Sequence, residues 1–174
     1  MSKPTSSSAA LPIAYVALRI LIVINWMIVP VILALLFVLP NEQWIMSAFK
    51  LSPSADAERV VMGMRAIAAL GLATVPLNFI VFKRLIAIIE TVRAGDPFVA
   101  ANASRLQAIA WALFSLQLLS LFIGAVAKAI STPEHPVKMA GFSVDGWLAV
   151  LLTFLLAGVF AEGTRMRQDL DGTV

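Results

Sequence analysis

The stretch that decides the fold is Leu85–Leu106, with the sequence LIAIIETVRAGDPFVAANASRL. It places charged and turn-forming residues between two apolar segments, each long enough to cross a membrane. Glycine is common just after a helix, aspartate is a strong N-cap, and proline favours the first helical position. Gly95, Asp96 and Pro97 supply these three residue types consecutively. We therefore expect a tight turn between two long helices, the second of which begins at Pro97 with Asp96 as its cap.

The composition on either side of this turn is that of a membrane protein. Of the 174 residues, 60% are hydrophobic and 13% are charged, whereas soluble domains have about 25% charged residues. A membrane-spanning helix needs about 20 mostly apolar residues, and no segment shows the alternation of a barrel strand. The fold class is therefore all-α, a four-transmembrane-helix bundle with predicted spans at about 18–39, 60–82, 107–128 and 144–161.

The two ends of the chain are expected to lie outside the hydrocarbon. Residues 1–10 are rich in serine and predict a disordered tail. Residues 11–163 form the single transmembrane domain, and residues 164–174 form a C-terminal tail. A cleaved signal peptide is the alternative for the first span, but its apolar run is too long and Phe37-Val38-Leu39 offers no small-residue cleavage site.

The distribution of basic residues predicts the orientation. Cytoplasmic loops carry an excess of lysine and arginine, and one side of the predicted bundle holds seven such residues against three on the other. We therefore expect both termini and the central turn in the cytoplasm. The seven are Lys3, Lys83, Arg84, Arg93, Arg105, Arg165 and Arg167, and the three are Lys50, Arg59 and Lys138.

The second helix is predicted to continue beyond its apolar span. Leu85, Ile88, Ile89 and Val92 recur with the spacing of one helical face, and no helix breaker precedes Gly95. About 12 further helical residues would extend roughly 18 Å as a cytoplasmic helical hairpin. Its apolar face either lies at the headgroup interface or packs on a neighbouring helix, which is the ordinary behaviour of amphipathic helices, or it offers a docking surface to a soluble partner.

Polar residues inside the predicted spans are candidates for function. Near the outer ends, an ion pair between Arg65 and Asp145 would hold the helices together, and an anion-binding vestibule is the alternative. Near the inner ends, Asn25 and Asn78 are expected to donate hydrogen bonds across helices, helped by kinks at proline. The full set is Arg19, Asn25, Arg65, Asn78, Gln117, Lys128 and Asp145.

Other features of the sequence argue against catalysis. Cysteine is absent and the one histidine, His135, has no cluster of carboxylates beside it in the sequence, so we expect no metal or cofactor site. No phosphate-binding glycine loop occurs, and an enzyme is not expected. Small residues at Gly63, Ala66, Ala69 and Ala73 predict close helix packing, within the bundle or in a homo-oligomer.

Two segments resemble a known family. The first is Arg93-Ala-Gly-Asp-Pro-Phe98 followed by Asn102 and Arg105-Leu106, and the second is the C-terminal segment VFAEGTRMRQDLDGTV from Val159. Together they resemble the bacterial family catalogued as domain of unknown function 2975. Members look like four-helix membrane proteins, so the resemblance implies a multi-pass protein of the bacterial inner membrane. Met166 and Gly172 depart from the family's usual C-terminal residues.

The resemblance also implies a partner, because similar proteins are often encoded beside a small helix-turn-helix transcription factor. The leading hypothesis is thus a regulatory membrane protein that docks this regulator and does not itself bind nucleic acid. The alternatives are a small transporter or channel, or an accessory subunit of a larger membrane complex. Asp169 and Asp171 would pair with basic residues of the regulator, unless they are simply solvated. The residues expected to dock it are Glu90, Arg93, Asp96, Phe98, Asn102, Arg105, Asp169 and Asp171.

Overall fold

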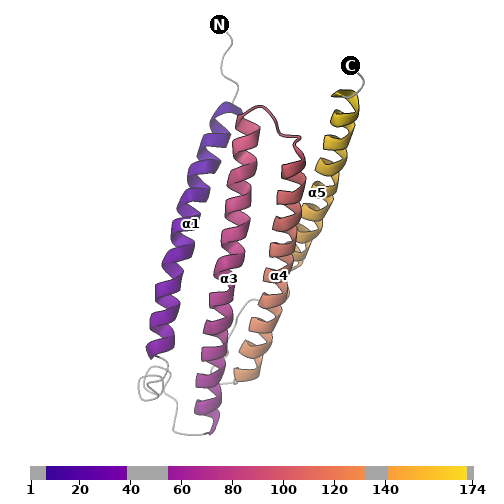
Figure 1. Ribbon diagram of the computed structural model, residues 1–174. Helices are drawn as coiled ribbons and strands as arrows, with labels where there is room; N and C mark the ends of the chain where they lie inside the picture. Colours follow the sequence, from indigo (N-terminus) through magenta and orange to yellow (C-terminus); the bar gives the residue numbers. More distant parts are fainter. Residues whose placement is uncertain (1–6, 39–54, 132–140, 172–174) are drawn as a thin grey trace.

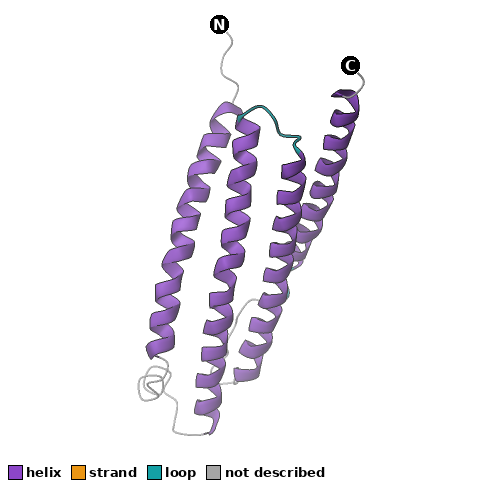
Figure 2. Ribbon diagram, viewed as in Figure 1, coloured by secondary structure: helices purple, strands orange, loops and turns teal. Residues whose placement is uncertain are grey.

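The computed structural model describes residues 7–38, 55–131 and 141–171, and these form four long helices (Figures 1 and 2). The helices are α1 (Ser7–Val38), α3 (Ala55–Arg93), α4 (Ala100–Ile130) and α5 (Val144–Asp171). Each is long and apolar enough to cross a membrane. No strand occurs in the described ranges. The predictions of an all-helical chain and of four candidate spans are therefore confirmed, which indicates a multi-pass membrane protein.

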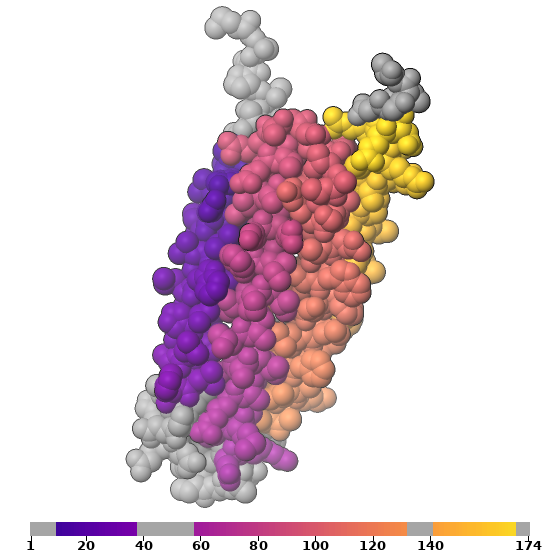
Figure 3. Space-filling view, in the orientation of Figure 1, coloured from indigo at the N-terminus to yellow at the C-terminus, as the bar shows by residue number. Residues whose placement is uncertain are grey.

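The helices pack in chain order. Contacts between elements join α1 to α3, α3 to α4, and α4 to α5, and Figure 3 shows α1, α3 and α4 side by side on one face. The largest buried cluster lies among α3, α4 and α5, where Val81, Leu106 and Ala157 meet. A smaller cluster joins α1 to α3 around Val61 and Ala68. As a result α4 is covered from two sides, whereas α1 is covered from one.

The uncovered faces are apolar. On α1, large side chains such as Ile13, Val31 and Phe37 are mostly exposed, and on α5 so are Leu151 and Leu155. A soluble protein would not leave contiguous apolar faces of this kind open to water. Lipid chains are the solvent that suits them.

Aromatic rings fill much of the contact between α4 and α5. Trp111 meets Phe154 edge-on with ring centroids 5.3 Å apart, and Trp147 meets Phe114 edge-on at 5.7 Å. Edge-to-face pairs of this kind are favoured by the ring quadrupoles. Two of the tryptophans thus pack between helices.

The hairpin of α3 and α4 is not an extension beyond the rest of the molecule. At about 1.5 Å per residue, every one of the four helices is longer than the roughly 30 Å of bilayer hydrocarbon. Figure 1 shows the start of α1 beside the α3–α4 turn and the end of α5 rising past it. The sequence predicted the long α3 correctly, but it did not predict that α1 and α5 reach the level of the turn.

Helix bounds also differ at both ends of the chain. α1 begins at Ser7, within the segment expected as a tail, and α5 continues to Asp171 instead of ending near residue 161. No proline interrupts the sequence between Phe160 and Asp171, so the helix has no reason to stop where its apolar residues stop. Lys3, Lys50, Lys138 and His135 lie outside the described residues, and the predicted excess of basic residues on one side stays a prediction.

Candidate functional site: the turn between α3 and α4

The turn begins with a complete helix stop. Gly95 has a φ of +85°, a conformation that glycine adopts without the steric penalty of a Cβ atom. The amide N–H of Gly95 donates to the carbonyl of Val92, and that of Asp96 donates to the carbonyl of Thr91. These two bonds define a Schellman motif, with Ala94 as the C-cap residue and glycine directly after it. The predicted role of Gly95 is confirmed.

The start of the next helix differs from the prediction. α4 begins at Ala100, and its N-cap is Val99, which has an extended backbone and makes no side-chain cap bond. Asp96 lies too early in the chain to cap α4. Its N–H closes the Schellman motif, and its carboxylate pairs with Arg167 of α5. Asp96 and Pro97 therefore belong to the connection rather than to the helix.

Asn102 holds the connection from inside. Its side chain is completely buried. The amide Nδ2 donates to the hydroxyl of Thr91 at 2.7 Å and to the carbonyl of Pro97 at 2.8 Å. The hydroxyl of Thr91 in turn donates to the carbonyl of Ile88 at 2.7 Å. One amide group thus ties the end of α3, the turn and the first residues of α4 together.

Arg105 of α4 completes this network. Its Nη1 donates to Oδ1 of Asn102 at 2.8 Å and to the carbonyl of Ala87 at 3.1 Å. Both hydrogen-bonding ends of the Asn102 amide are therefore satisfied, as a fully buried polar group requires. The arginine side chain is half-buried, and its direction is fixed by bonds to two helices.

α5 fastens the outside of the turn. The ring of Phe98 packs on Phe160 with centroids 5.2 Å apart. A Cβ atom at Gly163 would lie 3.2 Å from the Phe98 ring, so glycine allows this close approach. The ion pair between Arg167 and Asp96 lies beyond it, with both side chains about half exposed. Aromatic packing and one exposed ion pair together bind α5 to the connection.

The family match extends over nearly the whole chain. The model for the family described as a protein of unknown function, DUF2975, matches residues 5–174. The chain belongs to this family. No curated protein and no solved structure matches the chain. The two segments that carried the resemblance in the sequence meet in space, because Phe98 and Asp96 of the first contact Phe160, Gly163 and Arg167 of the second.

The predicted docking residues fall into two groups. Glu90, Arg93 and Asp169 are exposed, and Arg93 lies over the ring of Tyr15 of α1 at 5.8 Å. The other residues hold the turn. Asn102 is buried and Arg105 is half-buried. Asp96 pairs with Arg167, and Phe98 packs on α5 but is 43% exposed. The side chain of Asp171 lies outside the described side chains.

Sequence reasoning did not single out Thr91, Phe160 or Arg167 as contacts of the turn. Thr91 lies off the apolar face formed by Leu85 and Ile88, which both pack against the buried cluster, one of the uses considered for this face. A threonine four positions before the helix-stopping glycine was the available signal, since its hydroxyl can bond a carbonyl one turn back. Nothing in the sequence alone shows that residues 160 and 167 lie beside residues 98 and 96.

The polar residues inside the spans are distributed over separate helix contacts. Asn25 of α1 is buried and donates to the carbonyl of Val75 in α3 at 3.1 Å, next to Pro76. Gln117 of α4 lies against Gly146 of α5. Arg65 is half-buried in α3, whereas Asp145 is exposed in the first turn of α5, and the predicted ion pair between them stays a prediction. Three further polar residues of the predicted spans remain. Arg19 donates to the hydroxyl of Tyr15. Asn78 is half-buried and Lys128 is exposed.

The small-residue positions of α3 split between two surroundings. Gly63 is buried, and a Cβ atom there would lie 2.2 Å from Ile130 of α4, so this glycine serves packing within the molecule. Ala69 and Ala73 are exposed. In the described part of the chain, no three His, Cys, Asp or Glu side chains come together as a metal site would require.

Proposed function

We propose that this protein is a non-enzymatic membrane protein whose polar end captures a small soluble helix-turn-helix regulator. The observation that carries the proposal is that α5 continues as a helix to Asp171 and is fastened to the α3–α4 turn. The helix runs about ten residues, or roughly 15 Å, past the predicted span. A surface made of helices joined in this way is rigid, and rigid surfaces bind partners with a smaller entropic cost.

The exposed acidic residues of this surface would pair with basic residues of a partner, and the exposed Arg93 and Arg165 lie at the same end. Glu162 and Asp169 are exposed and lie seven positions apart on α5, which puts them on one helical face. Glu90 is exposed on α3. DNA-binding proteins present basic residues to phosphate, and acidic side chains complement the same surface. A regulator held here would have its DNA-binding face occupied.

The geometry divides the predicted docking residues by role. In the proposal Glu90, Arg93 and Asp169 contact the regulator, because they are exposed. Asp96, Asn102 and Arg105 shape the surface, because their polar groups are used inside the turn. Replacing the shaping residues would disturb the fold along with any docking, so they are poor probes of the interaction.

The test is capture of a purified helix-turn-helix regulator of the kind that similar proteins are often encoded beside, using tagged full-length protein purified from membranes. The variant Glu90→Lys/Asp169→Lys is expected to lower capture at least about tenfold, since charge reversal opposes a basic partner. The control is Glu58→Lys/Asp145→Lys, which makes the same charge change at two exposed positions at the opposite end. Capture that both variants retain, or that the unaltered protein lacks, would overturn the proposal.

A further inference from the structure

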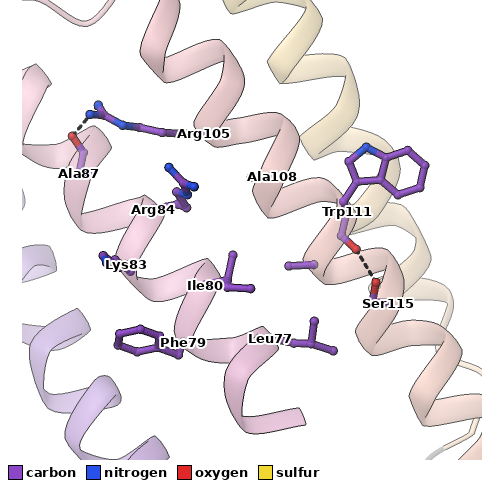
Figure 4. Close-up of a pocket in the computed structure, with 11 residues that line it drawn as sticks. Leu77, Phe79, Ile80, Lys83, Arg84, Ala87, Arg105, Ala108, Trp111 and Ser115 are labelled. Atoms are coloured by element: carbon purple, nitrogen blue, oxygen red, sulfur yellow. Dashed lines mark hydrogen bonds between the residues drawn. The ribbon is translucent and has the colours of Figure 1, made fainter. Parts of the chain in front are cut away.

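A groove between α3 and α4, next to the turn, is lined by both cationic and apolar side chains. It has a volume of about 650 Å³. Toward the turn it is lined by Lys83, Arg84 and Arg105, and farther from the turn by apolar side chains that include Leu77 and Trp111. Figure 4 shows this order directly, with the three cationic side chains at one end and Leu77 at the other. An occupant that matches both parts needs an anionic head and an apolar tail.

The cationic part of the groove has no acid beside it in its lining. None of the residues that line it is Asp or Glu. α4 contains no acidic residue, and the nearest one on α3 after Arg84 is Glu90, six positions along the chain. Like charges placed together cost free energy unless a counter-ion joins them. The three cations therefore favour an anion from outside the described chain.

Arg105 is prepared for such an anion. Its Nη1 is held by the carbonyl of Ala87 and by Asn102, and a guanidinium carries five N–H donors in a fixed plane. The donors that remain can bind a phosphate group without first losing the freedom of the side chain. Lys83 and Arg84 are exposed on α3 and supply two further positive charges, that of Lys83 lying over the ring of Phe79 at 5.9 Å.

The depth of the groove indicates where the anion comes from. Lys83 and Arg84 directly follow the apolar run that ends at Phe82, and Arg105 directly precedes the apolar part of α4. With spans predicted at about 60–82 and 107–128, these positions fall at the headgroup level of a bilayer. Farther from the turn, Ile80 lines the groove and is 39% exposed, so the apolar end of the groove opens to lipid. A small soluble anion would make no use of that end.

We infer that the groove binds one anionic glycerophospholipid. The headgroup phosphate lies among Lys83, Arg84 and Arg105, and an acyl chain lies along Leu77, Ile80 and Ala112. Basic pockets between membrane helices at the cytoplasmic level are a known way to recognise anionic headgroups. The inference depends on the membrane embedding of the four helices and not on capture of a regulator.

The test uses the full chain in mild detergent with equal amounts of phosphatidylglycerol and phosphatidylcholine, and native mass spectrometry counts each retained lipid. Phosphatidylglycerol is expected in about tenfold preference, because basic residues near a headgroup attract an anionic lipid more strongly than a zwitterionic one. Lys83→Gln/Arg84→Gln is expected to bring the preference close to equality. The control Arg19→Gln/Arg165→Gln removes two exposed charges outside the groove, and it is expected to keep the preference.

Three outcomes would overturn the inference. Equal retention of both lipids by the unaltered protein would show that the groove does not select headgroups. An equal loss in the control would show that overall surface charge causes the preference. Displacement of the lipid by an excess of water-soluble glycerol phosphate would assign the site to a free phosphate compound. Circular dichroism verifies that both variants retain their helices.

Discussion

Two buried asparagines hold this protein together in different ways. Asn102 is completely buried at the α3–α4 turn, where its amide donates to Thr91 and Pro97 and accepts from Arg105. Asn25 is 5% exposed between α1 and α3, and its amide donates to the carbonyl of Val75. The same side chain thus serves a polar network at one place and a single contact between helices at the other.

The difference arises from the backbone that each asparagine meets. Val75 lies inside a helix, where carbonyls are already bonded along the helix. Pro97 lies in the connection, where the carbonyl has no helical partner and needs a donor from elsewhere. Asn102 is therefore required by the turn, whereas Asn25 adds to a contact that apolar packing already makes around Ile32 and Leu36.

The largest expected effect comes from Asn102→Leu. Leucine has a similar branched shape but is larger, and it leaves the carbonyl of Pro97 without its donor and Arg105 with one of its two acceptors, the carbonyl of Ala87. Buried polar groups left in this way cost about 1–3 kcal/mol each. We expect the free energy of unfolding to fall by about 2–4 kcal/mol, measured by reversible unfolding in mixed micelles with tryptophan fluorescence. A loss below about 0.5 kcal/mol would mean that the network does not hold the turn.

A smaller effect is expected from Gly95→Ala. No heavy atom lies within 4 Å of the position where the Cβ atom would be, so only the backbone conformation opposes the change. A φ of +85° costs an alanine about 1–2 kcal/mol. The same unfolding measurement checks the size of this loss.

The matched control for this prediction is Gly158→Ala. Gly158 also has no neighbour within 4 Å, but it lies inside α5 with no positive φ. Alanine is favoured over glycine in a helix by up to about 1 kcal/mol, so the control should be neutral or stabilising. Equal destabilisation by both substitutions would show that the turn does not require glycine.

Features that local rules determine were mostly predictable from the sequence. Length and apolar composition predict four spanning helices, and the spacing of Leu85 and Ile88 predicts the buried face of α3. Gly95 stops α3 as its chemistry requires. Each of these features depends on residues close together in the chain, where helix periodicity and backbone sterics decide the outcome.

The errors concern features that depend on distant residues. Asp96 was predicted to cap α4, but α4 begins later and the carboxylate pairs with Arg167, which is 71 positions away. The turn was predicted to project, but α1 and α5 flank it (Figure 1). Both errors have one cause, because single-sequence patterns do not show which segments lie beside the turn. The family signature included Phe98 and Gly163, but only the structure shows that they touch.

The smallest effect is expected from Asn25→Leu, which makes the same chemical change as the first prediction at the other buried asparagine. The carbonyl of Val75 keeps its place inside α3, and leucine adds apolar contact between α1 and α3. Hydrogen bonds between membrane helices contribute about 0.6 kcal/mol on average, so we expect a change of at most about 1 kcal/mol in either direction. The measurement is the same unfolding titration, run beside Asn102→Leu. A loss as large as that of Asn102→Leu would show that α1 depends on a directional bond as strongly as the turn does. In that case the claim that apolar packing holds α1, whereas hydrogen bonds hold the α3–α4 turn, would be wrong.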